Sequence, residues 1–116
     1  MAKLTVYHNQ ACGNSRGALQ LLQERGVEFD IIEYLKTPPK REALEKILAM
    51  LEGPAADLVR KDKRFGELGL NPDDYTEPNK IVDLLLKHPE LMQRPIVIKG
   101  NRAIIARPPE KLTPLL

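Results

Sequence analysis

The sequence contains a single cysteine among its 116 residues, and this scarcity excludes several classes of protein. One thiol cannot form an internal disulfide, and it cannot build a metal site from several thiolates. We therefore predict no metal and no tightly bound cofactor. Any disulfide chemistry that this chain performs must take its second thiol from another molecule.

Long apolar runs and an excess of one charge are also lacking. No apolar stretch approaches the roughly 20 residues that a membrane-spanning helix needs, and residues 1–8 lead into a strand-like pattern that is unlike a signal peptide. With 18 Lys and Arg against 16 Asp and Glu, the net charge of +2 gives no footprint for a nucleic acid. We expect a cytoplasmic monomer with no membrane and no nucleic-acid partner.

The first third of the chain has the pattern of a strand, a helix and a second strand. Residues 3–8 and 27–34 alternate between apolar and polar side chains, and both ranges are rich in β-branched residues. Between them, residues 16–25 have the pattern of a helix, which Ser15 can cap at its start and Gly26 can end. Such a unit predicts two parallel strands joined by the helix.

The middle of the chain has the pattern of a helical segment. Thr37 can cap a first helix whose apolar residues repeat at helical spacing. Two short helical pieces follow, over residues 58–59 and 65–68. Thr76 can then cap a longer amphipathic helix over residues 77–87.

The last part of the chain predicts a β-hairpin and a short terminal helix. Residues 95–99 and 102–106 are apolar and β-branched, and Gly100-Asn101 between them suits a two-residue turn. The complete order predicts an α/β fold of the thioredoxin/glutaredoxin type. It has a four-stranded mixed sheet and a helical insertion between its two halves. We expect one domain over residues 1–116.

Cys12 lies in a polar loop at the start of the first predicted helix. Free N–H groups at a helix start favour a negative charge, and they lower a thiol pKa from its usual value of about 8.5. His8 and Arg16 are close enough in sequence to add positive charge. Ser15 either donates a hydrogen bond to the thiolate or only caps the helix. The polar neighbours favour a reactive thiolate over a small buried apolar residue.

Two arginines are distinguished by their positions at the ends of the predicted hairpin. Arg94 and Arg107 each precede a proline, which favours an extended backbone, and antiparallel pairing would bring them together. Pro95 is the position at which a cis peptide bond would place backbone close to Cys12. Arg60 belongs to a basic run, and the residues alone do not single it out.

Several segments resemble a known family when they are taken together. Residues 8–16, HNQACGNSR, resemble the active-site segment of the glutaredoxin-coupled arsenate reductases. Further similar segments follow in the family's order: residues 34–39, 58–60, 88–97 and 107–110. The resemblance covers nearly the whole chain. It departs from the family pattern at Gln10, where proline is usual, and in the short C-terminus.

This resemblance implies a set of roles. Cys12 would be the nucleophile, with Arg60, Arg94 and Arg107 binding arsenate or a related oxyanion. The family's histidine, which helps to lower the thiol pKa, matches His8, and its serine, which hydrogen-bonds the thiolate, matches Ser15. Glutathione would be the co-substrate, and glutaredoxin would reduce the resulting mixed disulfide.

Two other functions remain open at this stage. A lone cysteine also suits a glutathione-dependent thiol oxidoreductase whose substrate is a mixed disulfide or another small thiol compound. A non-enzymatic regulator similar to the Spx proteins, which bind RNA polymerase, is the third hypothesis. Those regulators usually carry two cysteines in a C-x-x-C motif, and Ser15 in place of the second cysteine counts against it.

Overall fold

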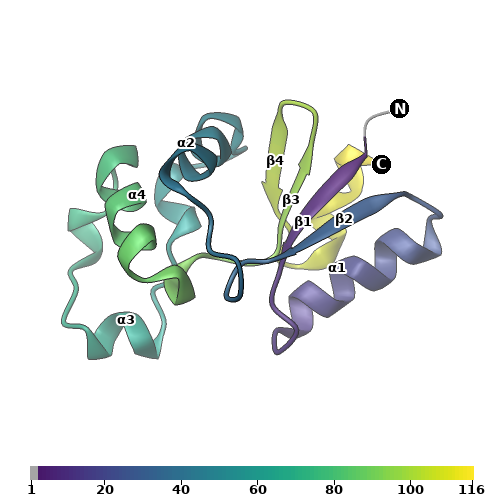
Figure 1. Cartoon of the computed structure of the whole chain (residues 1–116). Helices are drawn as coiled ribbons and strands as arrows, with labels where there is room; N and C mark the ends of the chain where they lie inside the picture. Colours follow the sequence, from purple (N-terminus) through teal and green to yellow (C-terminus); the bar gives the residue numbers. More distant parts are fainter. Residues whose placement is uncertain (1–2) are drawn as a thin grey trace.

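The computed structural model describes residues 3–116 and shows a four-stranded mixed sheet with helices on both faces (Figure 1). The strands stand in the order β2-β1-β3-β4. β1 pairs with β2 in parallel and with β3 antiparallel, and β3 pairs with β4 antiparallel. This confirms the predicted mixed sheet. The strand bounds are Leu4–His8 (β1), Phe29–Glu33 (β2), Ile96–Lys99 (β3) and Arg102–Ile105 (β4).

The helices form two groups on the two faces of the sheet, as Figure 1 shows. One group is α1 with the C-terminal 3-10 helix η4, and the other is the insertion between β2 and β3. No helix within residues 3–116 is long and apolar enough to cross a membrane. The α-helices are Gly13–Glu24 (α1), Arg41–Met50 (α2), Lys63–Glu67 (α3) and Pro78–Lys87 (α4); the 3-10 helices are Ala55–Leu58 (η1), Pro72–Asp74 (η2), Pro89–Leu91 (η3) and Pro109–Leu115 (η4).

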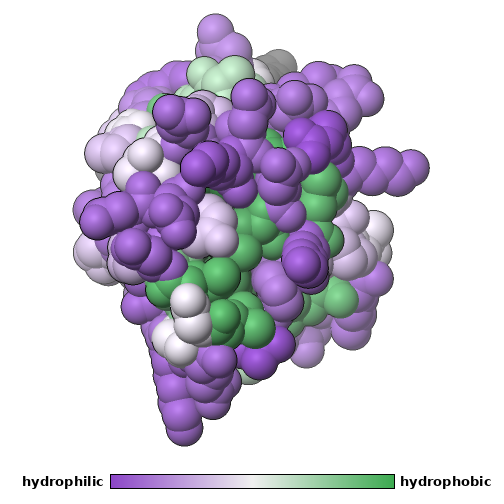
Figure 2. All heavy atoms as spheres, turned by 90° about the vertical axis from the view of Figure 1, so that its left-hand side faces the viewer, coloured by the Kyte–Doolittle hydropathy of each residue, from purple (hydrophilic) through white to green (hydrophobic). Residues whose placement is uncertain are grey.

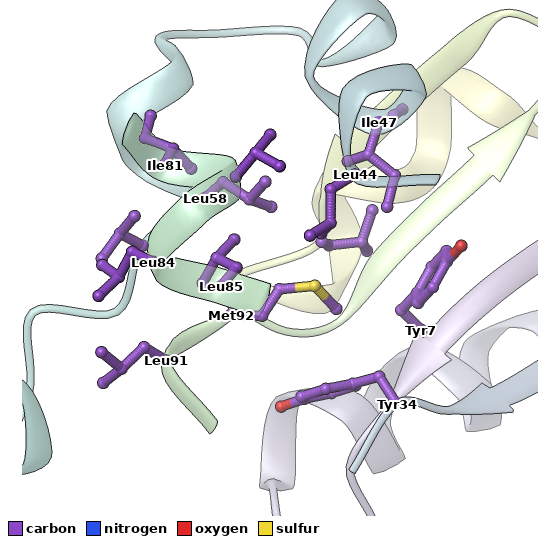
Figure 3. Packing of buried hydrophobic residues seen from close by; sticks show 14 of the residues in the cluster. Tyr7, Tyr34, Leu44, Ile47, Leu58, Ile81, Leu84, Leu85, Leu91 and Met92 are labelled. Atoms are coloured by element: carbon purple, nitrogen blue, oxygen red, sulfur yellow. The ribbon is translucent and has the colours of Figure 1, made fainter. Parts of the chain in front are cut away.

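Alternate side chains of the sheet supply two hydrophobic clusters. Val6 and Val97 point towards α1 and η4, whereas Tyr7 and Ile96 point towards the insertion. Figure 3 shows the insertion side, where Met92 lies beside Tyr7 of β1 and above Tyr34, which follows β2. Because both faces are covered, β1 and β3 are apolar on both sides.

A close approach between α1 and η4 fixes the segment that follows β4. A Cβ atom at Gly17 would lie 2.9 Å from Cγ of Pro109, so only glycine fits at this position without a shift. Arg107 lies two residues before Pro109. The docking of η4 on α1 therefore also places Arg107 near the loop that leads into α1.

The first helix begins earlier than the sequence indicates. α1 starts at Gly13, and its N-cap is Cys12, which has an extended backbone. Ser15 is therefore the third residue of the helix, and the prediction that it could be the N-cap is wrong. The free N–H groups of the first turn lie directly after the cysteine.

Two further predicted helix caps are wrong for one common reason. α2 begins after Lys40 and not after Thr37, and the N-cap of α4 is Glu77 and not Thr76. Pro38 and Glu77 each precede a proline, which holds them in an extended conformation, so neither can be the first helical residue that a cap at Thr37 or Thr76 would require. Pro39 and Pro78 therefore exclude these two caps, although the threonine side chains are suited to capping.

The second strand is shorter and more exposed than its alternation indicates. β2 covers Phe29–Glu33 of the predicted residues 27–34, and Ile31 is 48% exposed. β2 is an edge strand, and the neighbouring helix leaves part of it uncovered. The hairpin is confirmed, with Gly100 in its turn at φ +60°.

The outer face of the insertion is only partly hydrophilic. Figure 2 shows apolar side chains gathered in the middle of this face and framed by hydrophilic ones. Leu48 and Val82 line a hollow of about 270 Å³ between α2 and α4. Within the insertion, α2 packs on β4, whereas α4 packs on α2, η1 and η3, and part of the apolar surface of these helices stays accessible.

Candidate active site

The loop that carries Cys12 is held by its own hydrogen bonds. The Cys12 N–H donates to the Asn9 carbonyl at 3.0 Å, and the Ala11 N–H donates to Oδ1 of Asn9 at 2.9 Å. The Asn9 N–H lies 3.4 Å from Oγ of Ser15, to which it donates. These bonds hold Cys12 at the N-terminus of α1, where the residue is 8% exposed.

The surroundings of Cys12 lower the pKa of its thiol to about 6. Burial by itself raises this pKa. Hydrogen bonds from the Ser15 N–H, the Arg94 side chain, the Ser15 hydroxyl and the Asn14 N–H outweigh the effect of burial. The thiolate, which is the nucleophilic form of cysteine, is therefore the main species at neutral pH.

The two arginines at the ends of the hairpin lie together beside this thiolate, as the pairing of β3 and β4 indicates. Nη1 of Arg107 donates to Sγ of Cys12 at 3.5 Å and to the Arg94 carbonyl at 2.9 Å. Nε of Arg94 is buried and has no hydrogen-bond partner within residues 3–116. The peptide bond between Arg94 and Pro95 is cis, as is the one between Arg107 and Pro108.

Arg60 lies next to this cluster but further from the sulfur. Its Nη1 donates to Oε1 of Gln93 at 3.1 Å, and its Nε is 3.2 Å from Oδ2 of Asp62. Its side chain is only 18% exposed, so it is not part of a solvated basic run. Its hydrogen bonds within the described part of the chain do not reach Cys12. Gln93, its partner, directly precedes Arg94.

His8 is buried at the end of β1, four residues before the thiol. Burial lowers the pKa of its imidazole, the carboxylate of Glu33 raises it, and the charge of Arg16 lowers it again, so that the net shift is downward. His8 is therefore mostly neutral at neutral pH. Its charge is not what holds Cys12 in the thiolate form, whereas the N–H groups and Arg94 are.

Sequence reasoning missed Tyr34 as a member of this region. The residue is completely buried, and its hydroxyl makes no hydrogen bond of good geometry within residues 3–116. Burial raises the pKa of the phenol, while the charge of Arg94 and the nearby Asn9 side chain act in the opposite direction. Figure 3 shows the Tyr34 hydroxyl pointing away from Tyr7. In the sequence, Tyr34 only ends the alternating segment 27–34, and nothing in that pattern indicates a contact with Arg94.

Residues 3–116 offer no ready site for a metal. Among residues 3–116, no three His, Cys, Asp or Glu side chains lie together in a way that could hold an ion. The polar groups that converge near Cys12 are instead donors of hydrogen bonds. Guanidinium groups and free N–H groups are suited to an anion with several oxygen atoms.

The thiol of Cys12 should titrate with a midpoint near pH 6, so the thiolate fraction rises as the pH increases through this value. Ser15→Ala removes one of the stabilising donors and should raise the midpoint by about one unit. Ultraviolet thiolate absorbance measures both. Thr113→Ala, which removes a hydroxyl on η4, is the matched control. A wild-type midpoint at the ordinary value of about 8.5 would contradict the assignment.

The free energy of unfolding should depend on pH through the same Cys12 thiol. The pKa of Cys12 lies below that of the unfolded chain, so the thiolate stabilises the folded state fully above the unfolded value. This contribution is lost as the pH falls through about 6.

Replacing Tyr34 by phenylalanine keeps the packing of the ring and removes the hydroxyl beside Arg94. If the hydroxyl orients Arg94, the pKa of Cys12 should rise by a few tenths of a unit or more, because Arg94 donates to the thiolate. Tyr75→Phe, in the same helical insertion, is the control. A lower melting temperature with an unmoved thiol pKa would show that Tyr34 is only a packing residue.

Comparisons with known proteins agree with one another. Residues 7–114 match the model of the ArsC family. The arsenate reductase of Escherichia coli strain K12 is 39% identical over 117 residues, which cover this whole chain and 82% of that protein. The arsenate reductase of Neisseria meningitidis strain MC58 is 38% identical over the full length of both. The structure of an arsenate reductase from Vibrio cholerae, 32% identical, superposes with a TM-score of 0.88 over 99% of this chain and 98% of that one.

Proposed function

The chain belongs to the ArsC family, and from this premise we propose that it reduces arsenate to arsenite with Cys12 as the nucleophile. One observation carries the proposal: a thiol whose pKa is lowered to about 6 lies 3.5 Å from Nη1 of Arg107. Arg94 also donates to this thiol. Arsenate is an oxyanion, which arginine side chains hold by charge-assisted hydrogen bonds.

The first step is the attack of the Cys12 thiolate on the arsenic atom. A sulfur–arsenic bond forms and an arsenic–oxygen bond breaks, and the departing oxygen takes protons from solvent to leave as water. Arg94 and Arg107 offset the negative charge of the oxyanion while the thiolate approaches it. Nε of Arg94, a buried donor without a partner among residues 3–116, is available to an arsenate oxygen.

The second step requires a thiol from another molecule, because Cys12 is the only cysteine of the chain. Glutathione thiolate attacks the sulfur of Cys12 and forms a disulfide. The electrons of the broken sulfur–arsenic bond stay on arsenic, which passes from arsenic(V) to arsenic(III) and leaves as arsenite. Glutaredoxin then reduces the mixed disulfide and returns Cys12 to the thiolate.

The remaining roles follow the same proposal. Arg60 supplies a third positive charge at the outer side of the anion site, held in place by Gln93. Ser15 donates its hydroxyl to the thiolate. His8 remains a neutral buried residue at the end of β1, and Pro95 places the Arg94 backbone beside the loop. We place the reaction in the cytoplasm, where thiols are kept reduced.

We also propose that residues 1–116 form one catalytic domain. Its support is the cluster that Tyr7 and Ile96 of the sheet share with the helices of the insertion. Neither part could bury these side chains without the other.

The test is arsenite release by the purified protein in the presence of arsenate, glutathione and glutaredoxin. A parallel assay supplies a protein or peptide carrying a glutathione mixed disulfide. Arsenite release supports the proposal. Removal of glutathione from the mixed disulfide without arsenite release would favour the thiol oxidoreductase instead, and co-purification with RNA polymerase without either activity would favour the regulator.

A further inference from the structure

A groove of about 450 Å³ begins at Arg107 and passes between the η1 segment, β4 and η4. Its apolar lining includes Val59 and Ile105. Arg107 also donates to the sulfur of Cys12, so the groove meets the thiolate at this residue. A molecule in the groove would therefore have one end against Arg107, the residue that contacts the reacting sulfur. The volume lies within the roughly 300–1,000 Å³ that is usual for small-molecule sites.

Most charged side chains of the groove form no ion pair with the described residues. Among the described residues, Nζ of Lys61 donates only to the carbonyls of Ala56 and Val59, at 2.8 and 3.4 Å. Asp57 and Lys111 form no ion pair with the described residues. Glu52 also lines the groove, but its carboxylate is taken up by the guanidinium of a neighbouring arginine, Arg102, at 2.7 and 3.0 Å.

The groove thus presents two cations and one anion to a ligand, in addition to Arg107. Asp57, on η1, and Lys61, just after η1, lie on one wall, whereas Lys111 lies on η4. A matching ligand has an ammonium and a carboxylate close together at one end, and a second carboxylate at the other. It also has apolar methylene groups between them, to lie against Val59 and Ile105.

We propose that this groove is the binding site for glutathione, an inference that rests on the proposed function. The γ-glutamyl end of glutathione carries an α-ammonium and an α-carboxylate, which suit Asp57 and Lys61. The glycine carboxylate suits Lys111. The thiol between the two ends then lies towards Arg107 and Cys12, from where it attacks the Cys12 sulfur as described above.

The arsenate site and the groove share Arg107 and otherwise use different residues. The oxyanion occupies the space beside Arg94 and the start of α1, whereas the tripeptide approaches from the side of β4 and η4. Both substrates can therefore be bound at once, as the displacement of the arsenic adduct by glutathione requires.

A double variant, Lys61→Ala with Lys111→Ala, separates this inference from the proposed function. Loss of both carboxylate partners should raise the KM for glutathione about tenfold. The KM for arsenate and the pKa of the Cys12 thiol should not change, because neither lysine contacts the thiolate. Lys40→Ala with Lys46→Ala, which removes the same charge from α2 and its N-cap, is the matched control.

A binding measurement adds a readout that does not depend on turnover. S-methylglutathione, which cannot react, is titrated into the wild-type protein while the backbone amide resonances are followed. We expect shifts at Asp57, Lys61 and Lys111 that are lost in the double variant. Shifts confined to other parts of the surface, or an unchanged KM for glutathione in an active double variant, would overturn the inference. A wild-type protein that binds S-methylglutathione in the groove but does not release arsenite would contradict only the proposed function.

Discussion

Cys12→Ser should reduce arsenite release by about ten-thousandfold or more. A serine hydroxyl is not ionised near neutral pH, so the N–H groups at the start of α1 no longer have an anion to stabilise. The oxygen also cannot form a disulfide with glutathione, which removes the second step as well as the first. The measurement is the initial rate of arsenite release with glutathione and glutaredoxin in excess.

The same variant should still bind arsenate, which separates loss of chemistry from loss of folding. Arg94 and Arg107 remain in place, and the negative charge of the thiolate no longer competes for them. Calorimetric titration with arsenate should therefore give a dissociation constant no weaker than that of the wild type. Residual activity above about one hundredth of wild type would mean that Cys12 is not the nucleophile.

Arg94→Ala should lower kcat/KM for arsenate by about a hundredfold to a thousandfold near neutral pH. Two effects combine in this loss. Arg94 donates to the thiolate and helps to lower its pKa, and its Nε is a buried donor that is free for an oxyanion. Arg94→Lys keeps the charge without the planar pair of donors, so it should recover only part of the activity.

The pH dependence divides these two effects. Well above the ordinary thiol pKa of about 8.5, the thiolate is fully formed in both proteins, and only the loss of anion binding remains. The deficit of Arg94→Ala should therefore become smaller as the pH rises. Arg41→Ala removes an exposed arginine that pairs with Asp83 on α4, and it should leave kcat/KM within about twofold of wild type. A deficit that is constant with pH would remove the part assigned to the thiolate.

The sheet could be predicted from the sequence because its signals are local. Alternation over residues 3–8 and the Gly100 turn decide strand and hairpin without help from distant residues. The helix starts are harder to predict, because capping side chains such as Thr37 and Thr76 are present where no helix begins. The conformational restriction that proline places on the preceding residue is stronger than the preference of a cap.

The residues of the candidate site also differ in whether a local pattern or a long-range contact positions them. Arg94 and Arg107 could be paired from the sequence because the hairpin alone brings its two ends together. Arg60 could not, because its position depends on a bridge between Val59 and Met92, and no local pattern encodes such a long-range contact. Only the family resemblance pointed to it. Tyr34 gave no signal, because its burial beside Arg94 depends on how the insertion packs on the sheet.

Because the two faces of the sheet belong to two different hydrophobic clusters, we expect the insertion to open locally more readily than α1 and η4. The cluster under α1 and η4 supports the loop of Cys12 and the end of the hairpin, whereas Arg60 belongs to the insertion and its own cluster. Local opening of the insertion would carry Arg60 away while the thiolate stays in place. Amide hydrogen exchange in the insertion should therefore slow when an oxyanion is bound, because the anion then contacts both Arg60 of the insertion and the residues around Cys12.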